Sequence, residues 1–388
     1  MDFALSDEQK MILQTVREFV RRDLAPLLPE VQKAEIRGER FPDRSTTREL
    51  QQKAKTAGLW GLLTPEEHGG ADLGLLMTAL ISIETARSLV SFNYGGSADN
   101  ILYAGTDEQK QKYLLPTING ERRSCFALSE PGTGSDATNI QTRAIKDGGD
   151  WVINGQKTWI SGAHDADFAI VFAVTDPEKR ANGGITAFLV DREMGWKDQP
   201  IAMMSSWEAA DVFFDSVRVP TCNVLGDVGN GFGLAMQWIG QGRVLIPARA
   251  VGQAQALLQL GLDYARQRQA FGQPIANYQA IQWMLADSAI DIEQVKWPTL
   301  HAAWMADCGR DARHYASIAK VSGANMVWQV ADRVLQIHGG MGYTRELPIE
   351  RILREVRVYR IFEGTDEIQK RTIARNLLKD YVRIGEWD

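Results

Sequence analysis

The chain has few cysteines and few histidines. Its 388 residues include three cysteines, far apart and without a CxxC pair, so neither a disulfide framework nor a zinc site is indicated. The five histidines show no HExxH or other paired-ligand spacing. We therefore expect no metal site and a reducing compartment.

The sequence also lacks an excess of positive charge. It carries 43 lysines and arginines against 49 acidic residues, a formal net charge of -6. Binding to nucleic acid needs clustered basic residues that outnumber nearby acids. We expect no nucleic-acid binding, whereas small molecules that carry phosphate remain possible ligands.

No apolar run of membrane length occurs, and the first eight residues are acidic without a basic stretch that leads into an apolar one. These absences predict a soluble, cytoplasmic protein with no membrane association. At this length the chain is expected to fold as two or three domains.

The first of three zones, residues 1–121, has a helical pattern. Ser6 followed by Gln9 predicts a capping box, and the helix after it has Ile12, Val16 and Phe19 on its apolar face and ends near Pro26. A second helix is expected over residues 44–57. This zone is predicted to be an N-terminal helical domain.

In the second zone, residues 122–230, the hydrophobic period changes to two. Residues 151–161 predict a hairpin whose tight turn is Asn154-Gly155. Further strands are expected at 168–174, 185–190 and 212–219, with no helices between them. Such a pattern favours a central antiparallel β-barrel or sandwich.

The third zone, residues 231–388, returns to long amphipathic helices with short connections, which is typical of a helical bundle. Pro298 lies inside one of them and predicts a kink or break at Trp297. Residues 229–233 (GNGFG) have the wrong spacing for a dinucleotide fingerprint and no βαβ context. The fold class is therefore α+β and mostly α.

Glu363 is the strongest candidate for catalysis. It lies in RIFEGTDEIQ, residues 360–369, between bulky apolar residues and Gly364. Burial among apolar groups raises the pKa of a carboxylate toward neutrality and makes it a better base. An ordinary salt-bridged glutamate before a helix would look the same in the sequence.

Three other segments could bind a ligand or could be plain structure. Residues 126–136 form a Gly- and Ser-rich loop or a simple turn. Residues 266–275 place arginines at a helix end, where they could bind phosphate or cap the helix. Residues 336–343 stop a helix on glycines that could also admit a phosphate.

Taken in order, these segments resemble the acyl-CoA dehydrogenase family over nearly the whole chain. Five motifs in the family's order are more specific than any one of them. They are FALSEPGTGSD at 126–136, NGQKTWIS at 154–161, RQAFGQPI at 268–275, QIHGGMG at 336–342 and EGT at 363–365. The resemblance implies a helical N-terminal domain, a central β-barrel and a C-terminal four-helix bundle.

The resemblance also implies an activity in fatty acid metabolism. By similarity, Glu363 removes the α-proton of an acyl-CoA thioester, the β-hydride passes to FAD, and the product is a trans-2-enoyl-CoA. The backbone amide of the base is expected to contact the thioester oxygen. Some members place the base directly before an arginine on a bundle helix, and here that position is Gly242, before Arg243.

The family's binding residues can be assigned to positions in this sequence. Ser135, Arg243 and Gly364 match substrate positions. A homotetramer (a dimer of dimers) is implied because some of the flavin residues would reach a neighbouring subunit, and the electron acceptor is expected to be an electron-transferring flavoprotein. The matched FAD positions are Phe126, Leu128, Ser129, Trp159, Ser161, Arg268, Phe271, Gln336, Gly340, Thr365 and Glu367.

Other outcomes fit the same fold. The chain could be a flavin oxidase, an enoyl-CoA reductase or a flavin-binding relative without catalysis. The loop at 203–210 is atypical, and Trp207 and Glu208 there, with Trp238, could bind a cationic acyl group. Alternatively, these tryptophans pack in the protein and the acyl group is neutral.

Overall fold

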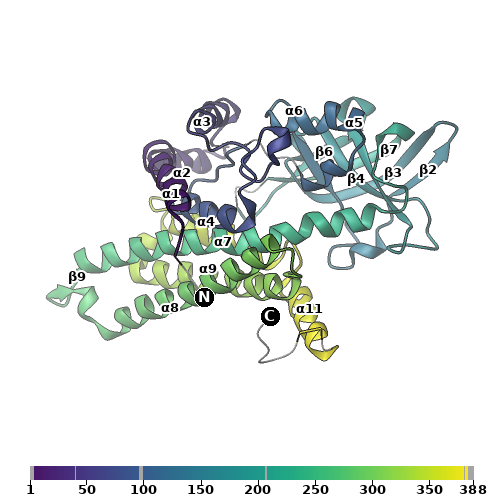
Figure 1. Ribbon diagram of the computed structural model, residues 1–388. Helices are drawn as coiled ribbons and strands as arrows, with labels where there is room; N and C mark the ends of the chain where they lie inside the picture. Colours follow the sequence, from purple (N-terminus) through teal and green to yellow (C-terminus); the bar gives the residue numbers. More distant parts are fainter. Residues whose placement is uncertain (1–3, 40, 96–98, 206–207, 380, 383–388) are drawn as a thin grey trace. The chain divides into compact units, whose positions relative to one another are not determined.

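The computed structural model describes residues 4–39, 41–95, 99–205, 208–379 and 381–382 (Figure 1). Contacts divide the chain into two compact units. The helical unit comprises Met1–Leu63, Ala71–Tyr94 and Gly240–Asp388, and the sheet unit comprises Thr64–Gly70 and Gly95–Ile239. The domain boundaries expected at residues 121 and 230 stay a prediction.

Helix α1 (Asp7–Phe19) opens the helical unit with the predicted capping box. Ser6 Oγ accepts a hydrogen bond from the Gln9 N–H at 3.1 Å, and Gln9 Oε1 accepts one from the Ser6 N–H at 3.0 Å. The helical path does not end near Pro26 as expected. A π turn (Val20–Leu24) and a 3-10 turn (Ala25–Leu27) lead directly into α2 (Leu28–Ile36). A proline in a first helical turn loses no intrahelical bond, so the path continues.

Two further helices complete this part of the unit. Helix α3 (Arg44–Thr56) confirms the expected helix over 44–57, and α4 (Gly74–Ala86) follows. The carboxylate of Asp307 accepts hydrogen bonds from the backbone N–H groups of Leu75 and Leu76 at 2.6 and 2.8 Å. This contact fixes the start of α4, whose first N–H groups have no intrahelical partner.

The C-terminal helices form the largest core of the unit. Their bounds are α7 (Gly231–Gln267), α8 (Gln279–Asp307), α9 (Arg313–His338), α10 (Ile349–Val356) and α11 (Asp366–Leu378). Buried Val251, Val295 and Val327 come from three of these helices and share that core.

Of the kink or break predicted at Trp297, the break is wrong. Helix α8 runs without interruption from Gln279 to Asp307, although Pro298 lies inside it. A proline costs an interior helix one hydrogen bond, about 3 kcal/mol. Val295 and Thr299, on either side of it, are buried in the unit, and this packing offsets the loss.

The sheet unit contains one eight-stranded sheet. Seven strands run in the order β6-β7-β3-β2-β4-β5-β8, and β1 pairs with β4. The strands are β1 (Ser124–Ala127), β2 (Arg143–Asp147), β3 (Asp150–Ser161), β4 (Phe168–Val174), β5 (Ile185–Asp191), β6 (Lys197–Ile201), β7 (Ala209–Pro220) and β8 (Val224–Leu225). The strands expected at 168–174, 185–190 and 212–219 are confirmed.

The predicted closed, wholly antiparallel barrel is wrong. Within the described residues β6 and β8 end the order without pairing with each other, so the sheet stays open. Strand β1 pairs with β4 in parallel, and β2 meets β4 through the single parallel pair of Arg143 and Val174. Closure would need continuous ladders on both sides of every strand, which one residue pair does not supply.

The hairpin predicted at Asn154-Gly155 is also wrong. These residues lie inside β3, and the actual hairpin joins β2 to β3 through Gly148 and Gly149. The pairing of β3 with β7 shifts register at Gly155, where a Cβ atom would lie 2.5 Å from Thr142 Oγ1. A bulge demands the same small, permissive residue as a tight turn.

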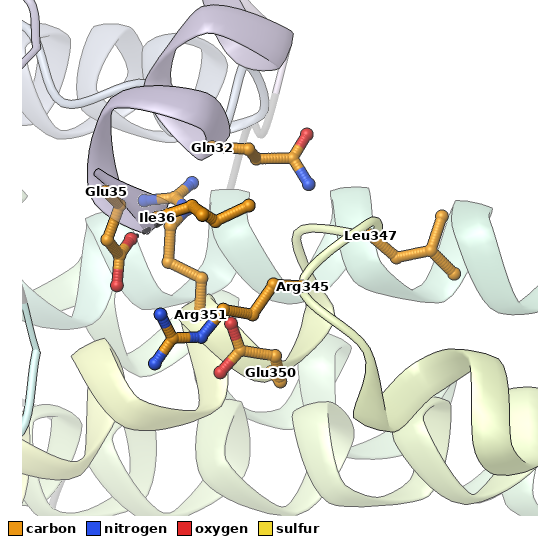
Figure 2. Close-up of a pocket in the computed structure, with 7 residues that line it drawn as sticks. All are labelled: Gln32, Glu35, Ile36, Arg345, Leu347, Glu350 and Arg351. Carbon is orange, nitrogen blue, oxygen red and sulfur yellow. Dashed lines mark ion pairs between the residues drawn. The ribbon is translucent and has the colours of Figure 1, made fainter. Parts of the chain in front are cut away.

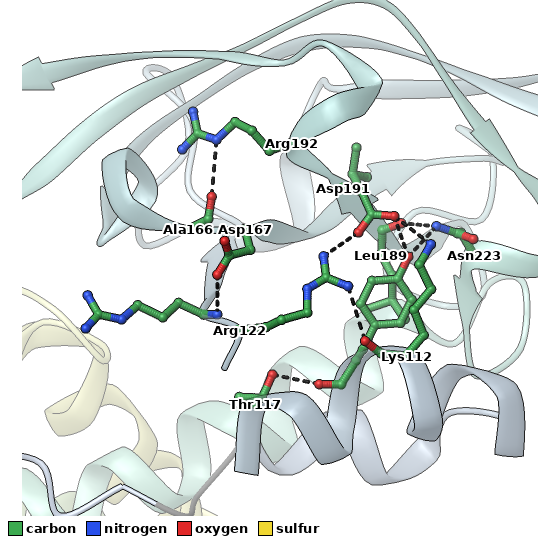
Figure 3. Close-up of polar contacts among 12 residues, drawn as sticks. Lys112, Thr117, Arg122, Ala166, Asp167, Leu189, Asp191, Arg192 and Asn223 are labelled. Carbon is green, nitrogen blue, oxygen red and sulfur yellow. Dashed lines mark hydrogen bonds and ion pairs between the residues drawn. The ribbon is translucent and has the colours of Figure 1, made fainter. Parts of the chain in front are cut away.

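Asp191, at the end of β5, fixes the helical segment Lys110–Leu114 to the sheet (Figure 3). Its carboxylate accepts hydrogen bonds from Lys112 at 2.8 Å, Tyr113 at 2.9 Å and Arg122 at 2.6 Å. Charge-assisted bonds of this kind are among the stronger polar contacts in proteins.

No helix in the described part of the chain is long and apolar enough to cross a membrane.

Candidate active site

Glu363 lies on a short turn between the 3-10 segment Arg357–Arg360 and α11. Both Glu363 (φ +56°) and Gly364 (φ +87°) have left-handed backbone conformations. Thr365 caps α11 by accepting a hydrogen bond from the Ile368 N–H at 3.3 Å, and Gln369 Nε2 donates to the Glu363 carbonyl at 2.8 Å. Residues with strained backbone conformations cluster at functional sites, and Glu363 on its capped turn has such a conformation.

The Glu363 carboxyl group is poorly solvated. The residue is half-buried, its Oε2 atom is buried, and no described residue donates a hydrogen bond to that atom. Burial raises the pKa of Glu363 to about 7, against the opposing influence of Arg243 and Lys320. A carboxylate with a pKa near neutral pH is suited to proton abstraction.

Gly242 on α7 lies against this carboxylate. A Cβ atom at position 242 would lie 2.9 Å from Glu363 Cδ and 3.1 Å from each carboxylate oxygen. The two positions expected for a base from the family resemblance therefore lie against each other in this chain. Glycine at 242 leaves that space to the side chain of Glu363.

Two cations contact the backbone of the turn. Arg243 Nε donates to the Glu363 carbonyl at 3.4 Å, and Lys320 Nζ donates to the Gly364 carbonyl at 2.7 Å. Burial lowers the pKa of Arg243, and it lowers the pKa of Lys320 to about 8. No described residue accepts a hydrogen bond from the Glu363 N–H.

Four of the predicted flavin residues lie at the other end of the helical unit. Arg268 and Phe271 follow the end of α7, and Gly242 and Gln267, 25 positions apart on that helix, are separated by about 38 Å at a helical rise of about 1.5 Å. His338 stacks on Tyr264 with ring centroids 4.2 Å apart, which brings the end of α9 to the same place. Gln336 and Gly340, next to His338, therefore lie near Arg268 and far from Glu363.

Five more of the predicted flavin positions are in the sheet unit, on β1, β3 and the loop after β1. That loop is fixed to β3 because the Thr158 N–H donates to the Ser129 carbonyl at 2.9 Å. Buried Lys157 donates to the Leu128 carbonyl at 3.0 Å and to Glu130 at 2.8 Å. These strands and this loop contain the five predicted flavin residues of the sheet unit: Phe126, Leu128, Ser129, Trp159 and Ser161.

The site residues suit a flavin. Trp159 is 57% exposed at φ +60°, and Phe271 is 97% exposed at φ +50°. Large apolar rings held in solvent by a strained backbone favour a flat ligand that covers them. Arg268 offers a planar fork for a phosphate, and Thr365 and Glu367 lie at the capped start of α11. Exposed Ser135 remains a predicted substrate contact.

Sequence reasoning missed Lys320 and Gln369, which hold the backbone of the Glu363 turn. A lysine on the buried side of an apolar helix was the available signal, because lysine is almost never fully buried without a partner. The cation hypothesis placed Trp207 near the acyl group, and Trp207 lies outside the described residues. Trp238 stacks on Phe126 at 4.0 Å and donates to Asp99 at 2.7 Å.

A small pocket elsewhere in the helical unit contains none of the predicted site residues. Figure 2 shows that its lining is mostly charged, with Arg351 Nε 3.9 Å from Glu35. Its volume of about 10 Å³ has room for one water molecule at most. The lining residues are Gln32, Glu35, Ile36, Arg345, Leu347, Glu350 and Arg351.

Comparison with known proteins identifies the family. Models of the acyl-CoA dehydrogenase N-terminal, middle and C-terminal domains match residues 6–121, 125–217 and 229–378. The human mitochondrial short-chain specific acyl-CoA dehydrogenase is 38% identical over 388 residues, 97% of this chain and 92% of that protein. The 3-(aryl)acrylate reductase of Clostridium sporogenes is 38% identical over 386 residues, 96% of this chain and 99% of that protein.

A solved structure agrees with these matches. Butyryl-CoA dehydrogenase from Megasphaera elsdenii superposes with a TM-score of 0.86 at 32% identity and covers 97% of this chain and 100% of its own. The chain therefore belongs to the acyl-CoA dehydrogenase family and is an oxidoreductase.

Proposed function

We propose that this chain oxidises a short-chain acyl-CoA thioester to the trans-2-enoyl-CoA, with Glu363 as the base. The Cα–H bond breaks and its proton passes to the Glu363 carboxylate, while the β-hydrogen leaves with its electron pair. The hydride needs a two-electron acceptor, and FAD would supply that chemistry when bound. The acyl length rests on the short-chain relative at 38% identity.

One observation carries the proposal. The carboxyl group that lies against Gly242 has a pKa raised to about 7 by burial, and its residue is fixed on a strained turn. Because the backbone N–H of Glu363 has no described acceptor, it can stabilise the charge that develops on the thioester oxygen. Arg243, whose Nε donates to the Glu363 carbonyl, would contact the substrate in this proposal.

We expect FAD contacts from two sets of residues, each within one unit. The helical unit offers Thr365 and Glu367, and the sheet unit offers Phe126, Leu128, Ser129, Trp159 and Ser161. Arg268 and Phe271 follow the end of α7, about 38 Å along the helix from Gly242, and Gln336 and Gly340 lie near them, so these four residues would hold the FAD of a neighbouring subunit. The flavin site in this proposal is complete only in an oligomer.

Helix α8 supports self-association. Trp283, Ile290, Trp297 and Trp304 are spaced by seven residues and are exposed by 59%, 52%, 45% and 41%. A seven-residue period keeps large apolar groups on one helix face, which is the arrangement of a helix–helix interface. We propose a homotetramer, as the family resemblance implies, that passes its electrons to an electron-transferring flavoprotein.

The reverse reaction is the second candidate. A reductase is as similar to this chain as the short-chain dehydrogenase, at 38% identity over nearly the full length. Residues that stabilise the transition state of one direction stabilise it in the other, so geometry does not separate the two. Flavin potential and the available electron partner decide the direction.

The test is an anaerobic titration of the purified, flavin-bound protein with acyl-CoA thioesters of increasing chain length. We expect butyryl-CoA and its near neighbours to bleach the flavin absorbance fastest. Oxygen consumption during turnover would identify an oxidase instead. Bleaching by none of the thioesters, together with reoxidation of the reduced flavin by enoyl-CoA or arylacrylate compounds, would support the reductase.

A further inference from the structure

Lys320 is a fully buried lysine on α9. Its Nζ atom donates a hydrogen bond of 2.7 Å to the carbonyl of Gly364, the residue directly after Glu363. Removing an ammonium group from water is costly unless its charge and its donors are used. A lysine in this place therefore calls for a reason beyond helix packing.

The backbone that Lys320 contacts is itself strained. Glu363 and Gly364 are consecutive residues at φ +56° and φ +87°, and for a glutamate this conformation is unfavourable. Such a conformation persists only where the surroundings hold it. Here Gln369 holds the Glu363 carbonyl at 2.8 Å, and Lys320 holds the carbonyl that follows.

We infer that Lys320 is a positioning residue that keeps the turn of Glu363 and Gly364 in its left-handed form. This form sets the direction of the Glu363 carboxylate and of its backbone N–H, the two groups that would act on the thioester. The inference rests on the proposed function for its catalytic consequence. The hold on the turn itself can be measured without any substrate.

The charges around the turn give a second consequence. Arg243 faces Glu363 from α7, Lys320 faces it from α9, and the first turn of α11 contributes Asp366 and Glu367. Asp366 is also paired with Arg360 at 2.8 Å. Both Arg243 and Lys320 lower the pKa of Glu363, so removal of the Lys320 charge leaves only the arginine to oppose burial.

The decisive variant is Lys320→Met, which keeps the apolar stem and removes the ammonium group. Ser317→Ala is the matched control, because Ser317 is equally buried on α9 and its hydroxyl donates only within its own helix, to the Arg313 carbonyl at 2.9 Å. Hydrogen exchange of residues 361–370 is measured on the flavin-bound protein. We expect exchange to be roughly tenfold faster in Lys320→Met, as for loss of one charged hydrogen bond, and unchanged in Ser317→Ala.

The second readout is the pH dependence of flavin reduction by butyryl-CoA. Lys320→Met should move the acid limb upward by about one pH unit, the lower end of the effect of a nearby charge. Lys320→Gln keeps a donor but not the charge, so it should show the pH shift with exchange closer to that of the parent protein. This variant also serves if Lys320→Met does not fold.

The outcomes separate the two proposals. If no acyl-CoA reduces the flavin of the parent protein, the proposed function fails, and the exchange measurement alone still decides the role of Lys320. Exchange in both lysine variants equal to that of the parent protein, or equal acceleration in Ser317→Ala, would overturn the inference.

Discussion

Replacement of Gly242 by alanine places one methyl group in the space of the Glu363 carboxylate. The added Cβ would lie 2.9 Å from Cδ and 3.1 Å from both oxygens, whereas carbon atoms in ordinary contact are about 3.5 to 4.0 Å apart. The carboxylate must therefore move by roughly 0.5 to 1 Å. A displacement of about 1 Å in a catalytic group can cost about 100-fold in rate.

The fold should survive this change. Gly242 lies in the interior of α7, where alanine is favoured over glycine by about 1 kcal/mol. We expect Gly242→Ala to melt no lower than the parent protein while anaerobic flavin reduction by butyryl-CoA, followed by stopped-flow absorbance, falls about 100-fold.

Gly240→Ala is the control on the same helix. A Cβ atom at Gly240 meets no heavy atom of the described residues within 4 Å, so this variant gains the same helix preference without touching Glu363. Its reduction rate should match that of the parent protein. A Gly242→Ala enzyme within twofold of the parent rate, or an equal loss in Gly240→Ala, would refute the reasoning.

Three further predictions concern pH, cofactor retention and assembly. The folded pKa of Glu363 (about 7) is raised above its ordinary value of 4.5, so the folded state binds more protons than the unfolded state in that window and stability falls as pH rises through it. Glu363→Gln has no such titration, so its free energy of unfolding minus that of the parent protein should increase from pH 5 to pH 8, by at most about 3 kcal/mol. Thermal unfolding at both pH values measures this difference, and an equal difference at pH 5 and pH 8 would contradict a raised pKa of Glu363. Arg268→Ala should lose FAD during gel filtration because the guanidinium fork no longer binds phosphate, and stoichiometric FAD at unchanged oligomeric mass would count against its role. The double variant with Trp283→Glu and Trp297→Glu should have a smaller oligomeric mass by analytical ultracentrifugation, because buried like charges repel across an interface. An unchanged oligomeric mass would show that the interface lies elsewhere.

The sequence predicts local structure well where one face of an element is buried. Strand β4 (Phe168–Val174) and helix α11 (Asp366–Leu378) begin and end where their hydrophobic patterns and capping residues indicate. Glu363 could be singled out as a candidate from its apolar neighbours and the glycine after it, and its role as the base stays a prediction.

The misses share a cause, since each depends on contacts that are distant in sequence. Gly155 looks like a turn glycine until the approach of Thr142 shows that it serves a bulge. The parallel pairing of β1 with β4 is set by the return path of the chain, and side-chain alternation does not encode it. Lys320 is 43 residues from Glu363, and only the packing of α9 under the turn reveals the contact between Lys320 and Gly364.

The most direct test of the central claim is anaerobic flavin reduction by butyryl-CoA in the Glu363→Gln enzyme. Glutamine is nearly isosteric with glutamate and cannot accept the α-proton, so FAD should stay bound while the reduction rate falls by about 10⁴-fold, the upper range for a general base. Reduction of the Glu363→Gln flavin within tenfold of the parent rate would contradict the assignment of Glu363 as the base.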